Sequence, residues 1–201
     1  MFTGNMVTEA IPARVFSLYK IVAGGKEVTR AEIQSMMEPA EIYEGTSYFS
    51  AIFKAASELR IIDTQDTLVV PLVSKESMNN IEDFRSFAIS KLNTFEDEQF
   101  FQVTNAIVNM NEQIYKYQLT DNALLNILSQ QTGSQITPPM IRGWRFWAQF
   151  LGFGYINNMS FLPNAYIFVK NILKLMNLEK NKEYEMNDFV LMFEPYGKII
   201  S

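Results

Sequence analysis

Residues 141–163 read IRGWRFWAQFLGFGYINNMSFLP, and this stretch decides which fold the sequence predicts. The apolar residues Ile141, Trp144, Ala148 and Leu151 are three and four positions apart, so they fall on one face of a helix. A helix with one such face packs that face against other elements. The stretch therefore predicts a buried helix at its start.

Two glycines and a polar turn follow this helix. Gly152 and Gly154 are expected to end the helix and to supply turn geometry. Short apolar runs flank Asn157 and Asn158, and asparagine tolerates the left-handed conformations of tight turns. This order predicts a two-stranded ribbon directly after the helix.

The same pattern occurs 92 positions earlier, in residues 49–71, FSAIFKAASELRIIDTQDTLVVP. This offset aligns Thr29 with Asp121, and both residue types are favoured at helix N-caps. It also aligns the apolar residues of a preceding helix, which are Val15, Leu18 and Val22 in the first copy and Ile107, Met110 and Ile114 in the second. Identical residues are few, so the repeat is inferred from pattern and spacing.

Three helices followed by a small ribbon resemble the winged helix-turn-helix superfamily. The predicted fold class is mainly α with small β-wings, built as two tandem winged helix-turn-helix units plus extra helices. The predicted domains are a winged helix at 10–73, a linker and packing helix at 74–98, a second winged helix at 99–163 and a C-terminal helical extension at 164–201. Outside the ribbons we expect a loose leader at 1–9, one long helix at about 97–117 and a short helix that ends before Pro195.

The composition excludes several classes of function. Hydrophobic residues make up 48% of the 201 residues, which is typical of a globular chain. Cysteine and histidine are both absent, so disulfides and catalysis by Cys or His are impossible. The glycine-rich nucleotide-binding motifs and the serine nucleophile motif are also absent. The first residues do not resemble a signal peptide, and the longest apolar stretch is too short to span a bilayer, so we expect a cytoplasmic protein.

Charge is unevenly distributed along the chain. The net charge is -5, which argues against a protein dedicated to nonspecific binding of nucleic acid. Residues 138–178, however, contain four basic residues and no acid. This basic segment on an acidic protein keeps DNA as a candidate partner.

The third helix of a winged helix enters the DNA major groove, which gives two sets of candidate DNA-binding residues. In the first winged helix, this third helix offers Ser47, Ser50 and Lys54. In the second winged helix, it offers Arg142, Arg145 and Gln149. Lys170 and Lys174 complete the basic segment. Alternatively, the two arginines pair with acids of another element or cover apolar surface.

The aromatic residues Trp144, Phe146, Trp147 and Phe150 surround the second of these helices. One interpretation is a helix buried in the centre of the protein, with no free face to enter a groove. The other is an exposed protein-binding patch, because Trp and Arg are common interface anchors. The acids at 96–98 suit a first helical turn better than a metal site, and no cofactor is expected.

A second resemblance covers roughly residues 140–198 and is carried by the segments GWRFWAQFLGFGYINNMSFLPNAYIFVKNIL and EYEMNDFVLMFEPYGKI. They are similar to the DpdG proteins of bacterial phage-defence islands, which accompany a cluster for 7-deazapurine DNA modification and restriction. The resemblance implies a non-catalytic accessory factor in antiviral defence. It supplies no catalytic residue.

Our leading hypothesis is a non-enzymatic, DNA-associated accessory factor of a bacterial anti-phage defence or regulatory system. Its expected partners are double-stranded DNA, other proteins of the defence system and a second copy of the chain, with no membrane. The alternative is a protein–protein interaction adaptor that dimerises or acts as a scaffold without binding DNA. An enzyme is the third hypothesis, for which the sequence offers no recognisable site.

Overall fold

The computed structural model describes residues 1–200, and it is mainly helical with small antiparallel strand pairs. The first part of the chain forms α1 (Pro12–Val22), β1 (Val28–Thr29), α2 (Arg30–Met37), α3 (Phe49–Glu58), β2 (Ile62–Gln65) and β3 (Leu68–Pro71). The middle contains α4 (Ile81–Lys91), the 3-10 helix η1 (Leu92–Phe95), α5 (Gln99–Asn109), η2 (Asn111–Lys116) and α6 (Asn122–Thr132). The last part contains α7 (Pro138–Leu151), β4 (Gly154–Asn157), β5 (Ser160–Pro163), α8 (Tyr166–Leu175), α9 (Met186–Gly197) and η3 (Lys198–Ile200).

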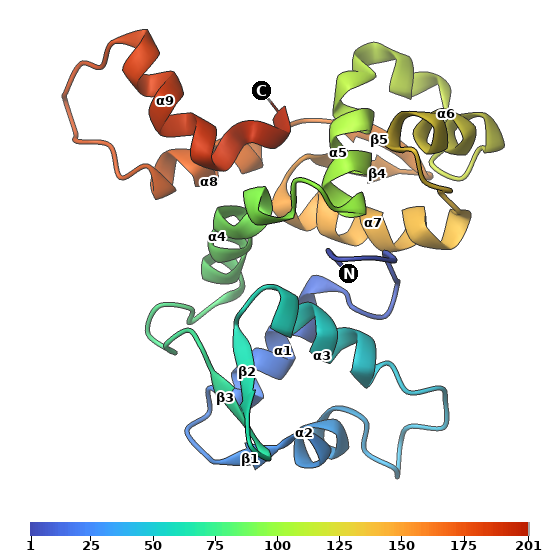
Figure 1. Cartoon of the computed structure of the whole chain (residues 1–201), viewed down its shortest axis with the longest axis vertical. Helices are drawn as coiled ribbons and strands as arrows, with labels where there is room; N and C mark the ends of the chain where they lie inside the picture. Colours follow the sequence, from blue (N-terminus) through green and yellow to red (C-terminus); the bar gives the residue numbers. More distant parts are fainter. Residues whose placement is uncertain (201) are drawn as a thin grey trace.

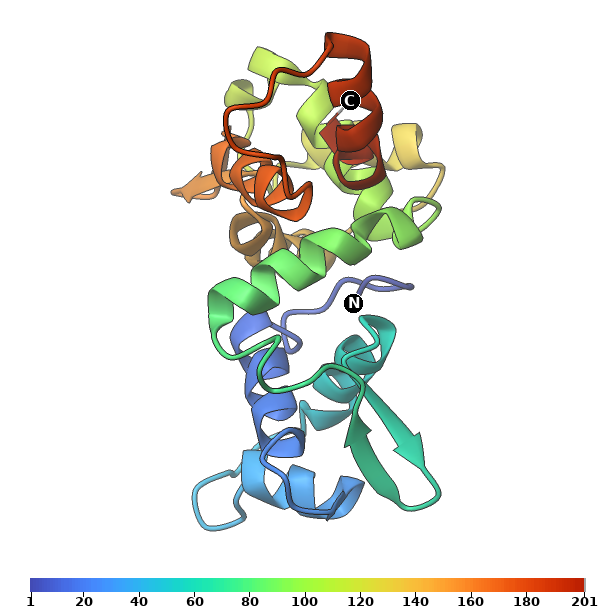
Figure 2. The ribbon, with the colours of Figure 1, turned by 90° about the vertical axis from the view of Figure 1, so that its left-hand side faces the viewer.

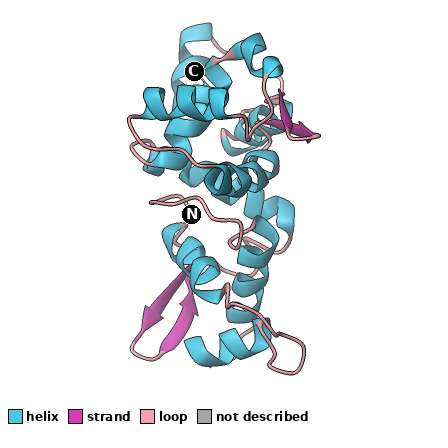
Figure 3. Cartoon of the chain, turned by 90° about the vertical axis from the view of Figure 1, so that its right-hand side faces the viewer, coloured by secondary structure: helices cyan, strands magenta, loops and turns pink. Residues whose placement is uncertain are grey.

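The elements form two groups stacked along the long axis of the molecule (Figure 1). The lower group contains α1, α2, α3 and the β1–β3–β2 sheet, and the upper group contains α5 to α9 with the β4–β5 ribbon. Helix α4 and the N-terminal segment lie between the two groups (Figure 2). The two sheets lie on opposite sides of the molecule, far from each other (Figure 3).

The two ribbons match in position and register. β4 and β5 lie 92 positions after β2 and β3. Ile62 pairs with Pro71 and Gln65 with Leu68, while Gly154 pairs with Pro163 and Asn157 with Ser160. Helices α2 and α6 begin at the same offset.

The two groups differ in the strand before the second helix. In the lower group β1 pairs with β3 and adds a third strand. In the upper group the corresponding segment contributes one backbone hydrogen bond, from the Leu119 N–H to the Met159 carbonyl at 2.7 Å.

Of the two predicted N-caps, one is present in the structure and the other is not. Thr29 caps α2 in a capping box with Glu32, as predicted. Asp121 occupies the N-cap position of α6, but its carboxylate does not cap the helix. It accepts instead from the Gln118 N–H at 2.8 Å, and so closes the preceding turn.

The prediction of one long helix at 97–117 was wrong. Helix α5 starts only at Gln99 and ends at Asn109, and Asn111 has a left-handed φ of 49° that starts a separate 3-10 segment. The prediction that a helix ends before Pro195 was also wrong, because α9 continues through this proline to Gly197.

The turn of the second ribbon lies one residue later than expected. Asn158 and Met159 occupy it with φ of 48° and 65°, the values of a type I′ turn, while Asn157 belongs to β4. Gly152 ends α7 with a φ of 86°, as predicted. Gly154 supplies no turn, because it lies in β4, where a Cβ would overlap the Phe161 ring and the Leu162 carbonyl.

The prediction of a loose leader at 1–9 was wrong. Phe2 is completely buried, and its ring stacks on Phe95 with centroids 5.0 Å apart. It also meets the edges of Phe100 and Trp147, at 5.2 Å and 4.6 Å. The N-terminal segment therefore fills the space between the two groups, and the buried residues of both groups form one continuous core.

Glu58, at the end of α3, holds this segment in place. Its carboxylate accepts from the Met1 amine at 2.9 Å, from the Phe2 N–H at 2.8 Å and from the Thr3 hydroxyl at 2.5 Å. Burial raises the pKa of the Glu58 carboxyl, but these hydrogen bonds and the positive amine outweigh burial and hold the pKa below its ordinary value.

The segment then crosses α7 at Gly143. A Cβ at this position would lie 2.7 Å from the Val7 carbonyl carbon and 2.8 Å from that of Met6. No side chain fits in this space without moving backbone, so glycine permits the close approach of the segment to the helix.

We expect Gly143→Ala to lower the free energy of unfolding by about 2 kcal/mol through overlap with this backbone. The loss occurs although alanine favours a helix by about 1 kcal/mol relative to glycine. Urea unfolding measures it. Gly45→Ala is the control, since a Cβ there meets only the Tyr43 ring at 3.7 Å, an ordinary contact. An equally small effect of both substitutions would contradict the close approach.

The Glu58 contacts predict a dependence of stability on pH. A carboxyl whose pKa is lowered by folding stabilises the folded state above its unfolded pKa, and this contribution is lost as the pH falls through the folded pKa. We expect Glu58→Gln to cost about 2 kcal/mol of unfolding free energy at pH 7, because charged hydrogen bonds are lost. The difference from the native chain should shrink below pH 4.5. Glu41→Gln, at an exposed position, is the control, and a pH-independent difference would refute the ion pair.

Candidate nucleic-acid interface

Helix α7 is held at both ends and by its two tryptophans. It begins with two prolines, whose fixed φ suits a first helical turn, and ends at the left-handed Gly152. The Trp144 indole donates to the Thr104 hydroxyl at 2.9 Å, and the Trp147 indole donates to the Ala10 carbonyl at 2.7 Å. Both tryptophans are fully buried, so they belong to the core and form no exposed patch.

Helix α7 nevertheless has an exposed face, so it is not buried on every side. Arg142 and Gln149 are exposed, and Arg145 and Phe146 are half-buried. These residues are three and four positions apart, so they share one side of the helix. The face opposite the tryptophans is thus available to a ligand.

Arg145 reaches from this face to the turn of the ribbon. Its Nη1 donates to the Met159 sulfur at 2.9 Å, and its guanidinium lies 4.9 Å from the centroid of the Phe146 ring. Within residues 1–200, neither Arg142 nor Arg145 forms an ion pair with an acid. The alternative of arginines paired with acids is therefore wrong, whereas Arg145 does cover apolar surface.

The ribbon has an exposed side of its own. Tyr155 and Leu162 are cross-strand partners, 49% and 40% exposed, on the outer side of β4 and β5. The sequence analysis did not select them, although alternation along a strand would have placed them opposite the buried Phe161.

Lys170 and Lys174 lie on α8, apart from α7. Both are exposed, and the Lys170 amine lies 6.0 Å from the centroid of the Tyr166 ring. The first turn of α8 packs against the end of α7, since a Cβ at Gly152 would lie 2.7 Å from Ile167. The basic segment thus extends from one helix to the next without an intervening acid.

The start of α3, in the lower group, is already occupied by a carboxylate. Glu38 accepts from the Tyr48 N–H at 2.7 Å and the Phe49 N–H at 3.0 Å. The Ser47 hydroxyl donates to the same carboxylate at 2.6 Å. Burial raises the pKa of Glu38, but the hydrogen bonds from Ser47, Tyr48, Gln34 and Phe49 together lower it, so the group stays charged. A phosphate would meet this negative charge at the helix N-terminus.

The other two candidates on α3 differ from each other. Lys54 donates to the Thr3 carbonyl at 3.2 Å and lies 3.6 Å from a Glu58 carboxylate oxygen. It therefore helps to fix the N-terminal segment. Ser50 is exposed. The structure thus engages Ser47 and Lys54 in internal contacts that sequence reasoning did not anticipate.

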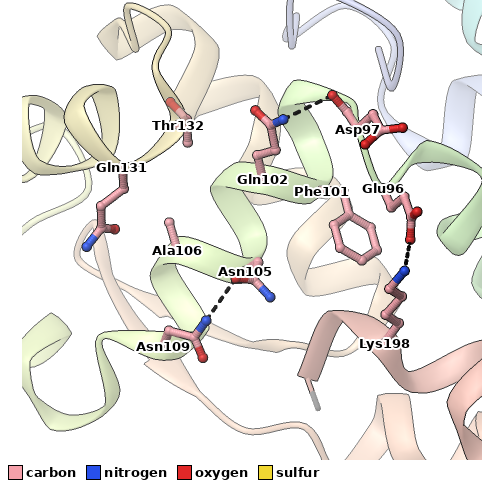
Figure 4. A pocket seen from close by; sticks show the side chains of 10 residues that line it. All are labelled: Glu96, Asp97, Phe101, Gln102, Asn105, Ala106, Asn109, Gln131, Thr132 and Lys198. Carbon is pink, nitrogen blue, oxygen red and sulfur yellow. Dashed lines mark hydrogen bonds and ion pairs between the residues drawn. The ribbon is translucent and has the colours of Figure 1, made fainter.

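A separate groove crosses the outer side of α5 (Figure 4). It has a volume of about 550 Å³. Helix α5 forms its floor, and the end of α6 and η3 form its walls (Figure 4). Its lining is rich in side-chain amides, and the full set is Glu96, Asp97, Phe101, Gln102, Asn105, Ala106, Asn109, Gln131, Thr132 and Lys198.

The groove contains several polar side chains besides apolar surface, and its lining carries a net negative charge from Glu96, Asp97 and Lys198. The Asn109 amide donates to the Asn105 carbonyl oxygen at 2.8 Å, and the Gln102 amide donates to the Asp97 backbone carbonyl at 3.0 Å. Lys198 pairs with Glu96. Sequence reasoning missed this groove, since its walls come from distant segments, although the spacing of the three amides on α5 would have placed them on one face.

The described residues contain no group of three or more acidic, His or Cys side chains that could hold a metal ion. Within the same part of the chain, no helix has the length and apolar character needed to cross a membrane.

Comparisons of the chain with models of protein families, with curated proteins and with solved structures give no match. The winged-helix and DpdG resemblances accordingly stay predictions.

Proposed function

We propose that this chain is a non-enzymatic protein of two tandem winged helices that binds double-stranded DNA through α7. The observation that carries the proposal is the exposed face of α7, where Arg142, Arg145 and Gln149 lie. Arg145 reaches the turn of the small ribbon, and neither arginine forms an ion pair with an acid in the part of the chain that the structure describes. Arginine and glutamine are the side chains that read guanine and adenine edges and contact phosphates.

The order of elements supports the winged-helix part of the proposal. In the lower group, a strand between the first two helices pairs with the last strand of the sheet, and α3 precedes the ribbon. The upper group repeats the order of three helices and a ribbon, with its second helix and its ribbon 92 positions later. Its first helix lies only 87 positions later, so the expected alignment of Met110 and Ile114 with the first helix was wrong, because both lie beyond the end of α5. In such a unit the third helix and the ribbon approach the duplex together.

The two units have different roles in this proposal. Glu38 places a carboxylate at the start of α3, and Lys54 is engaged by Thr3, so the lower unit is poorly suited to phosphate. The upper unit has the basic segment, including Lys170 and Lys174 on α8. DNA therefore binds the upper unit, and the lower unit is free to bind a protein.

The biological context that we propose is a bacterial anti-phage defence or regulatory system, in which the chain is an accessory subunit. This part follows from the resemblance of residues 140–198 to the DpdG proteins. It makes other proteins of the same system the partners of the lower unit.

We expect the double substitution Arg142→Ala, Arg145→Ala to weaken binding to a labelled random duplex. Each phosphate contact contributes about 0.9 to the slope of log affinity against log salt, so the slope should flatten by about 2. Fluorescence anisotropy at low and physiological salt measures both quantities.

The control for this experiment is Lys182→Ala, which removes an exposed positive charge paired with Glu179 far from α7 in the sequence. It should leave affinity almost unchanged. Equal binding by the native chain and the double variant would remove the DNA proposal for α7.

A protein–protein adaptor is the second candidate function, and the surface of α9 favours it. Met186, Val190 and Leu191 are 73%, 53% and 64% exposed, and they lie within two turns of one helix. Exposed apolar residues gathered in this way are typical of an interaction surface.

If α9 joins two copies of the chain, sedimentation of the native chain should show a dimer. Leu191→Asp should then raise the dissociation constant of the dimer at least tenfold, which is about 1.4 kcal/mol. Lys180→Asp changes charge at an exposed position of the adjacent loop and serves as the control. A native chain that stays monomeric at all concentrations and captures no host protein would count against the adaptor.

A further inference from the structure

We propose that the groove over α5 binds an extended peptide segment that carries a basic side chain. This site is independent of the DNA-binding face of α7. Its floor and walls come from α5, α6 and η3, and none of the candidate DNA-binding residues lines it.

The shape of the groove suits a chain in extended conformation. The groove has a volume of about 550 Å³, and the small side chain of Ala106 lies on its floor between Gln102 and Asn109 (Figure 4). Asn109 lies seven positions after Gln102 on the helix, which corresponds to a rise of about 10 Å along the helix axis. Three residues of extended peptide cover about the same length.

The chemistry of the amides matches a peptide backbone. A side-chain amide has both donors and acceptors, as a peptide unit does. The hydrogen bond from Asn109 Nδ2 to Asn105 Oδ1 leaves the side-chain oxygen Oδ1 of Asn109 and the side-chain nitrogen Nδ2 of Asn105 for a ligand. Gln131 adds a third amide from the opposite wall (Figure 4). Both donors and acceptors thus line the groove.

The charge of the groove selects the ligand. Glu96 and Asp97 lie at one end beside Lys198, so the carboxylates of the lining outnumber its one cation. A phosphate backbone is repelled there, whereas a lysine or arginine of a peptide is attracted. Glu96 and Lys198 are 40% and 51% exposed, so their pair is screened by water and a ligand cation can compete for the carboxylate.

The test uses the full chain labelled with ¹⁵N and follows the side-chain amide resonances of Asn105, Asn109 and Gln131. The probes are two pools of capped pentapeptides, acetyl-Xaa-Xaa-Lys-Xaa-Xaa-amide and the same pool with Glu in the centre. We expect the Lys pool to shift these three resonances, with an affinity about fivefold higher than that of the Glu pool.

Two variants examine the groove itself. Ala106→Phe fills the floor, and Asn105→Ala with Asn109→Ala removes the amides, so both should abolish the shift at Gln131. The matched control is Gln130→Ala, which removes an exposed amide next to Gln131 that does not line the groove. Unfolding curves verify that each variant is folded. Because one variant fills the floor and the other removes the amides, each tests the groove separately.

The proposal is overturned if neither pool shifts these resonances, if the shifts spread equally to Gln130, or if the Glu pool binds better. A five-nucleotide thymidine oligomer that shifts the groove more than the Lys pool would also overturn it. The Arg142→Ala, Arg145→Ala chain should bind the Lys pool normally, so failure of the DNA proposal and failure of the peptide site are distinguishable.

Discussion

The burial of Phe2 is the contact on which the rest of the structure depends. Its ring is completely buried against Phe95, Phe100 and Trp147, which lie in η1, α5 and α7. The hydrogen bonds to Glu58 fix the segment on the lower group, and the close approach at Gly143 fixes it on the upper group. The orientation of α7 relative to α3 therefore follows from the first residues of the chain.

Much of the secondary structure was predictable because its signals are local. Apolar spacing, the Thr29 cap and the glycine at the end of α7 each act within a few residues, and the helices and ribbons formed close to the expected positions. The N-terminal segment was not predictable, since it has no periodicity and Trp147 is 145 positions from Phe2. The break at Asn111 depends on one backbone angle, which composition does not encode.

The candidate interface was predictable in part. Spacing on α7 identified a face with Arg142, Arg145 and Gln149, and the structure exposes that face while it buries both tryptophans. The Glu38 carboxylate at the start of α3 was missed, because the two segments are joined by a loop whose path the sequence does not specify. The groove was missed for the same reason, as its walls meet only in the folded chain.

The contact between Phe2 and Trp147 also affects how the protein is made. Synthesis proceeds from the N-terminus, so the first helices leave the ribosome long before α7 exists. Until residue 147 emerges, Phe2 lacks one of its aromatic neighbours. Such a long separation between contacting residues slows folding. The core between the two groups is thus completed only after most of the chain has been translated.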